Sequence, residues 1–133
     1  MTLSEIKERV MFQSNNDADD LEDFEPHIGE YVNDGYDRLV VVWDKKHVPC
    51  DDYPALSLDA DEPKTPEWTH KYLADWATWL IYRNGNPQKQ NRGMAFREAF
   101  ETMLRAVAEQ GGINGQNDDG SLKKYNNFIN IPV

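Results

Sequence analysis

Several pairs of acidic residues in this sequence stand three positions apart, a spacing that places both carboxylates on one face of a helix, and three of these pairs are considered as metal ligands. Two such pairs on facing helices could hold Mg²⁺, which prefers carboxylate and water oxygens, for the hydrolysis of a nucleotide. Acidic pairs are also ordinary on exposed helix faces, so a magnesium-dependent nucleotide pyrophosphohydrolase is a minor alternative. The pairs are Glu22 with Glu25, Asp34 with Asp37, and Glu98 with Glu101.

Other patterns of catalytic or metal-binding residues are incomplete. His47 and Cys50 have the spacing of half a zinc site, but no second pair of ligands follows. Residues 15–26 fail as a calcium loop, because the sixth place holds Asp20 rather than glycine and the twelfth holds Pro26 rather than glutamate. No glycine-rich phosphate loop and no nucleophile elbow is present. We therefore predict no metal, no cofactor and no enzymatic activity.

The composition describes a small, acidic chain. Its 133 residues fit one domain, and 24 acidic against 14 basic residues give a formal net charge of -10. Residues 1–65 hold 17 of the acidic and 6 of the basic residues. Such a surface repels DNA phosphates and anionic membranes. With a single cysteine, Cys50, and no apolar run near 18 residues, we expect a soluble, cytosolic chain without a disulfide or a membrane span.

Two helices are predicted in the first third of the chain. Thr2 and Glu5 have the spacing of a capping box, which begins a short helix. After a polar break, apolar residues recur at three- and four-residue spacing as far as position 43, which predicts a long amphipathic helix. Pro26 either starts this helix or kinks it, and Gly29 and Gly35 suggest close approach by another backbone. The apolar residues are Leu21, Phe24, Ile28, Val32, Tyr36, Leu39 and Trp43.

A third helix is predicted between residues 66 and 83, with Thr65 as its cap and proline at its first position. Its apolar residues spread over more than half of the helical circumference, and only Lys71, Asp75 and Thr78 form a clearly polar strip. A surface helix has a narrower apolar stripe, so we expect this helix to be covered on two sides. Its bulky aromatic residues are Trp68, Tyr72, Trp76 and Trp79.

The remaining segments complete an all-α prediction, a small bundle of three to four helices. Asn86 and Pro87 start the last helix, and Gly111 ends it. Residues 44–64 form a long acidic loop, with a short extended piece at residues 55–58. Residues 111–133 contain two turn dipeptides and the β-prone sequence FINIPV, which predicts an extended or hairpin tail. We expect a helical domain over residues 1–110 and a tail over residues 111–133.

This order of elements resembles the head-tail connector proteins of tailed bacteriophages, also called head-completion, neck or adaptor proteins. Residues 3–110 carry the resemblance: LEDFEPHIGEYVNDGYDRLVVVW, then a long loop, PEWTHKYLADWATWL, the step NGNPQKQ, and FREAFETMLRAV. It implies an all-α subunit that is made in the bacterial host cytoplasm and forms a homo-oligomeric ring in the neck of the virion. The ring would extend the DNA channel below the portal, and DNA would pass through it without specific binding.

The resemblance also implies partners and interface residues. The expected partners are other copies of the chain, the portal protein and a tail-completion protein. On this reading Trp68, Tyr72, Trp76 and Trp79 provide packing or a subunit interface. The tail docks on a partner through Lys123, Lys124, Tyr125, Phe128, Ile129 and Ile131. The main alternative is an acidic helical interaction module, such as an inhibitor or a DNA mimic, because clustered carboxylates can imitate a phosphate path.

Overall fold

The computed structural model describes residues 1–14, 21–44 and 53–115, and every regular element in these ranges is a helix. Four helices have 12 residues or more, which confirms the predicted all-α class and the small bundle. The α-helices are α1 (Leu3–Ser14), α2 (Leu21–Phe24), α3 (Ile28–Trp43), α4 (Glu67–Tyr82) and α5 (Pro87–Glu109). Two 3₁₀ turns, η1 (Glu25–His27) and η2 (Gly112–Gly115), complete the described elements.

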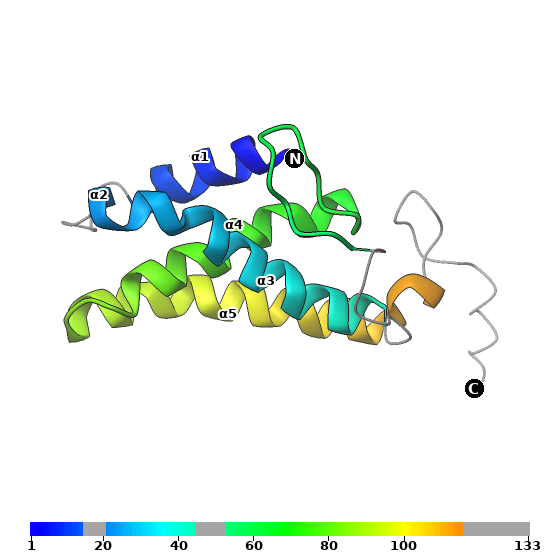
Figure 1. The fold of residues 1–133 in the computed structure, drawn as a ribbon. Helices are drawn as coiled ribbons and strands as arrows, with labels where there is room; N and C mark the ends of the chain where they lie inside the picture. The colour runs from blue at the N-terminus through cyan, green and yellow to red at the C-terminus, as the bar shows by residue number, and fades with distance from the viewer. Residues whose placement is uncertain (15–20, 45–52, 116–133) are drawn as a thin grey trace.

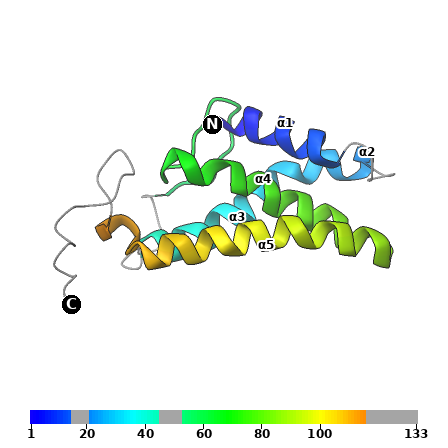
Figure 2. The same ribbon diagram turned by 180° about the vertical axis from the view of Figure 1, so that it is seen from behind.

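Helix α4 occupies the centre of the bundle. It contacts α1, α3 and α5, whereas we predicted cover on two sides only. Figures 1 and 2 show α3 and α5 running in one direction and α1 and α4 running in the other. The aromatic residues of α4 therefore pack mainly against helices of their own chain.

The predicted capping box at the start of α1 is confirmed. The Thr2 amide donates to Glu5 Oε1 at 2.8 Å, and the Glu5 amide donates to Thr2 Oγ1 at 3.2 Å. The Leu3 amide, which no residue of the helix can satisfy, donates to the Asp61 carbonyl at 2.7 Å. The beginning of α1 is thus held by a loop that lies far along the chain.

Pro26 interrupts the second predicted helix, which is one of the two outcomes that the sequence allowed. Residues 25–27 form the 3₁₀ turn η1 around Pro26, and regular helix resumes at Ile28. The apolar face of α3 is buried as the spacing predicted, through Val32, Tyr36, Leu39 and Trp43. At Gly35 the close neighbour is a side chain rather than the predicted backbone, because an added Cβ would lie 3.1–3.3 Å from Trp76 side-chain atoms.

The predicted cap of α4 is wrong by one residue. Pro66, with an extended ψ of 145°, stands at the N-cap, and no side chain caps the helix. The Thr65 hydroxyl instead accepts a hydrogen bond from Thr69 Oγ1 at 2.9 Å. Threonine before proline has the composition of a helix start, but here the extended backbone of the proline moves the first helical residue to Glu67.

The start and end of α5 are as predicted. Asn86 Oδ1 accepts the Lys89 amide at 2.9 Å, and Pro87 takes the first helical position. Gly111 ends the helix with a φ of 83°, in the left-handed region that glycine adopts without strain. Within the helix, a Cβ at Gly93 would lie 2.6 Å from Tyr82 Cβ, so glycine allows α4 and α5 to pack closely.

Residues 53–64 of the predicted loop are fixed by side chains of α3. Asn33 Oδ1 accepts the Leu56 amide at 2.8 Å, and Asn33 Nδ2 donates to the Leu56 carbonyl at 2.9 Å. The Tyr36 hydroxyl accepts the Lys64 amide at 2.9 Å. No strand occurs in the described part of the chain; residues 55–58 lie outside any helix, and one asparagine satisfies the backbone of residue 56.

The remaining predictions fall largely beyond the described ranges. His47 and Cys50 lie outside the described residues, and so does the tail with Lys123, Lys124, Tyr125, Phe128, Ile129 and Ile131. The start of the tail is described as far as residue 115, and the α-carbon of Gly112 lies close to the Trp43 carbonyl. Among the helices described, none has both the length and the hydropathy of a membrane span.

Candidate functional site

Trp76 belongs to the core of the bundle. Its side chain is nearly fully buried, and its ring lies 4.8 Å from the ring of Phe100, centroid to centroid. The indole Nε1 donates to Asp34 Oδ2 at 2.7 Å, and Arg38 lies over the ring at 4.8 Å. Burial alone would raise the pKa of Asp34, but the hydrogen bonds from Trp76 and Arg38 hold it below its usual value. Trp76 is therefore an internal packing residue.

The other three aromatic residues, Trp68, Tyr72 and Trp79, are only partly buried, and we call them the aromatic strip. They fall within about 40° of one another on the circumference of α4. Trp79 packs against the α5 backbone at Gly93 and lies 5.6 Å from the Arg97 guanidinium. The ammonium of Lys71 lies 5.2 Å from the Tyr72 ring. The strip thus has an apolar surface that is bordered by cations.

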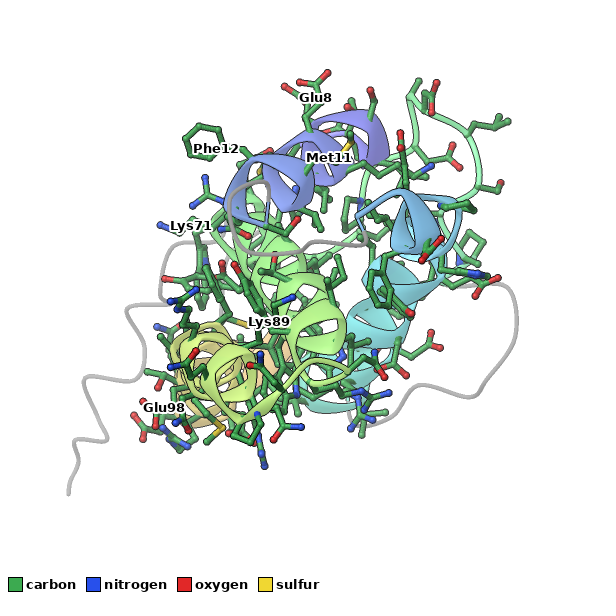
Figure 3. The ribbon with its side chains drawn as sticks, turned by 90° about the vertical axis from the view of Figure 1, so that its left-hand side faces the viewer. Glu8, Met11, Phe12, Lys71, Lys89 and Glu98 are labelled. Atoms are coloured by element: carbon green, nitrogen blue, oxygen red, sulfur yellow. The ribbon has the colours of Figure 1, made fainter. Side chains whose placement is uncertain are left out.

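One large apolar side chain beyond the strip is exposed on α1. Phe12 has 84% of its surface exposed. Figure 3 shows Phe12 projecting away from the bundle, on the side where Lys71 of α4 also lies. A single exposed apolar residue needs no explanation, but its position beside a partly covered aromatic helix makes this side the natural candidate for a contact.

The polar strip predicted on α4 is largely covered by α1. Asp75 is 8% exposed and Thr78 is fully buried. Gln13 of α1 donates from Nε2 to Asp75 Oδ1 at 2.9 Å, and its Oε1 accepts from Thr78 Oγ1 at 2.8 Å. Burial raises the pKa of the Asp75 carboxyl, although Gln13 and the positive charges of Arg9 and Lys71 act in the opposite direction. One glutamine therefore satisfies two buried polar groups.

A second polar cluster lies where α4 begins, and we call it the Glu-His cluster: Glu62, Glu67 and His70. One ligand-type atom from each side chain lies within 4.8 Å of the others. The amine of Met1 lies among them, 2.7 Å from Glu67 Oε2, 2.9 Å from His70 Nδ1 and 3.4 Å from Glu62 Oε1. Although burial opposes its charge, hydrogen bonds from the amine to the two carboxylates raise its pKa. The cluster therefore favours a positive charge at its centre.

The orientation of the His70 ring follows from its second nitrogen. Nε2 lies 2.8 Å from the Thr65 carbonyl, which can only accept, so Nε2 carries the proton and Nδ1 presents a lone pair to the cluster. The residue is 3% exposed. Burial lowers the pKa of His70, and the neighbouring amine lowers it further. The imidazole is thus held neutral, in the tautomer that can bind a cation.

Of the three acidic pairs, the two whose side chains are both described, Asp34 with Asp37 and Glu98 with Glu101, do not gather into a comparable group. In the described part of the chain, the only set of three potential ligands found close together is the Glu-His cluster. Asp34 is engaged by Trp76 and Arg38, and Glu101 pairs with Arg97 at 3.5 Å. The spacing of the acidic residues therefore did not indicate this cluster. The pair Glu67 and His70, also three positions apart, was a usable signal, but Glu62 joins it only through the fold.

Three comparisons with known proteins found no match. No family model matches the chain, no curated protein matches it, and no solved structure matches it. The class of protein that the described residues define is a small all-α bundle around a central aromatic helix.

Proposed function

We propose that this chain is a structural subunit of virion assembly, similar to a phage head-tail connector, which forms a ring below the portal and extends the DNA channel. The observation that carries the proposal is the aromatic strip, because a central helix has three large rings that its own bundle covers only in part. The helices follow one another in the order predicted from the sequence, and that order is the pattern on which the resemblance rests. On this proposal, the function of the protein is to assemble with other subunits of the virion.

The chemistry of the strip suits a contact between copies of the chain. Aromatic and arginine side chains are enriched at the centres of protein interfaces. Closing a ring requires two different faces that fit each other. One face is the strip with the cations of Lys71 and Arg97. The complementary face would be acidic and would draw on exposed carboxylates of η1, α3 and the loop: Glu25, Glu30, Asp59 and Glu62.

The charge of the chain suits the wall of a DNA channel. A surface with an excess of carboxylates repels phosphates, so DNA can slide past without adhering. The proposal leaves the contacts with the portal and with a tail-completion protein to residues 123–131. Those residues lie outside the described part of the chain, and their role is a prediction from the resemblance alone.

Light scattering coupled to size-exclusion chromatography, over a range of concentrations and with negative-stain imaging, tests this proposal. The expected result is closed rings, alone or on added portal protein. Tyr72→Glu places a carboxylate in the strip and should reduce the assembly to smaller species that remain helical by circular dichroism. Ala95→Glu is the matched control, because Ala95 is exposed on α5 two positions from Gly93 and so on the opposite side from α4.

Three outcomes would contradict the connector. A monomer that stays monomeric with portal protein present would do so. If that monomer bound a basic protein with an affinity that falls steeply as salt is added, the inhibitor or DNA mimic would become the preferred function. Magnesium-dependent hydrolysis of nucleotides that is lost on Glu22→Gln and Glu25→Gln would instead support the pyrophosphohydrolase.

A further inference from the structure

We infer that the Glu-His cluster is a binding site for a divalent transition-metal ion of the zinc type, held by Glu62, Glu67 and His70. The donor set is one imidazole nitrogen and two carboxylates, which together suit Zn²⁺. The three donor atoms already lie within 4.8 Å of one another, and small rotations of two exposed glutamates would bring them onto one ion. This inference does not depend on the proposed function.

The fixed histidine is what separates this cluster from an ordinary group of surface acids. A metal-binding histidine almost always donates its other ring N–H to a carboxylate or a backbone carbonyl, which sets the tautomer and the direction of the lone pair. His70 does this through Nε2 and the Thr65 carbonyl at 2.8 Å, while its side chain is 4% exposed.

A cationic group already marks the position of the ion. The Met1 nitrogen lies 2.7 Å from a Glu67 oxygen and 2.9 Å from His70 Nδ1. Zinc lies about 2.0–2.2 Å from its nitrogen and oxygen ligands. An ion in place of the amine would therefore lie closer to the donors than the nitrogen does now, and movement of the two exposed glutamates would close the difference. The ion would take the place of the ammonium, and water would complete its coordination.

The chain contains its own control for this arrangement. His27 and Glu30 are also three positions apart on a helical segment, with Nδ1 and Oε2 3.3 Å apart. The His27 side chain is 52% exposed, and no third potential ligand joins the pair within the described residues. If spacing alone were sufficient, both pairs would bind metal equally. If the buried, oriented ring and the third donor matter, only the Glu-His cluster would bind.

Calorimetric titration of the metal-stripped full-length chain with ZnCl₂ tests the inference. A background with His47→Ala and Cys50→Ser removes the histidine and the cysteine that lie outside the described ranges, so His27 and His70 are the histidines that remain. The expected result is one ion per chain, with a rise in Tm on adding zinc. Glu67→Gln and Glu62→Gln should each weaken binding at least tenfold. Both residues are exposed, so these variants should fold. The control variant with His27→Asn and Glu30→Gln should bind like the background protein.

Two results would overturn the site. The first is no saturable binding of zinc up to 1 mM in the background protein while circular dichroism shows that it is folded. The second is binding that Glu67→Gln retains and the His27 control loses, which would place the ion on the surface of α3. The ¹⁵N chemical shift of His70 Nδ1 should change as zinc is added, because this nitrogen would bind the ion. It should not change if the glutamates act only on the stability of the fold.

Discussion

Helix α4 meets its neighbours in two different ways. Towards α3 and α5 it presents Trp76 and a close backbone contact at Gly93, with no gap left for an extra methyl group. Towards α1 it presents polar groups, with Gln13 joined to Asp75 and Thr78 near one end of α1, and the Met1 amine joined to His70 at the other. The apolar side is held by packing alone. The polar side adds hydrogen bonds, paired one by one, to the buried apolar residues Leu3, Ile6 and Val10 of α1.

The difference matters because the two sides respond differently to change. A packed apolar contact loses stability roughly in proportion to the volume removed. A buried hydrogen bond contributes little net stability, about 1 kcal/mol, but a buried group that loses its partner is costly. The apolar side is therefore expected to carry most of the stability of the bundle, while the polar side fixes where α1 lies along α4.

The largest effect is expected at Trp76, on the apolar side. Trp76→Ala removes a nearly buried ring and the partner of Asp34, and should lower the free energy of unfolding by about 3–5 kcal/mol. Urea denaturation followed by circular dichroism measures this loss. Trp79→Ala removes the same ring from a partly buried position and should cost clearly less. Equal losses would show that the strip is as much a part of the core as Trp76.

The apolar side of α4's contacts was easier to predict from the sequence than the polar side, for a physical reason. Apolar residues repeat with the period of the helix, so the buried face of α3 was predicted almost residue by residue. The caps at Thr2 and Asn86 and the helix end at Gly111 were predicted as well. A buried polar residue has no such period. Asp75 is buried only because Gln13, 62 positions away, supplies a donor, and nothing local to either residue signals it.

The candidate site shows the same limit. The sequence singled out four aromatic residues, and the structure assigns one of them, Trp76, to the core and leaves three partly exposed. The Glu-His cluster was missed because Glu62 comes from an irregular loop, whose position depends on the hydrogen bonds from α3. Spacing along a helix can indicate a pair of ligands, but a third ligand requires the tertiary structure.

A smaller effect, at Gly93, tests how tightly the apolar side is packed. Alanine favours helix over glycine by about 1 kcal/mol, yet its Cβ would lie 2.6 Å from Tyr82 Cβ and 2.9 Å from the Trp79 ring. Gly93→Ala should therefore give a net loss of about 2 kcal/mol in urea denaturation. Gly29→Ala is the matched control, because its nearest contact is the flexible end of Lys7 at 3.4 Å. It should be neutral or stabilising; a loss as large as that of Gly93→Ala would contradict the packing argument.

On the polar side, Gln13→Met tests whether the hydrogen bonds matter beyond filling space. Methionine has a similar volume but cannot donate to Asp75, whose carboxylate would remain buried without the amide. The expected cost is about 1–2 kcal/mol at neutral pH, and it should become smaller at low pH, where the carboxyl is protonated. Gln88→Met changes the same side chain at an exposed position and should have no effect. No loss from Gln13→Met would mean that packing alone holds α1.

The smallest expected effect is a gain in stability rather than a loss, and it comes from Asp75→Asn on the polar side of α4. Burial raises the pKa of Asp75 in the folded protein above the value near 3.8 of an unperturbed aspartate. The folded state then binds the proton more tightly than the unfolded state, so stability is lost as the pH rises from the unfolded pKa through the folded pKa. Asp75→Asn keeps an oxygen that can accept from Gln13 and removes the charge. It should stabilise the protein at pH 7, on the order of 1 kcal/mol, and the gain should vanish below about pH 4.

Urea denaturation of both proteins between pH 3.5 and pH 7.5, a range of about four pH units around the relevant pKa values, measures this gain. Asp59→Asn, at an exposed position of the loop, controls for the loss of one negative charge from an acidic chain. A loss of stability at neutral pH would mean that the charged hydrogen bond from Gln13 outweighs the cost of burying the carboxylate. The polar side of α4 would then stabilise the bundle by itself, and the contrast with the apolar side would be one of chemistry but not of strength.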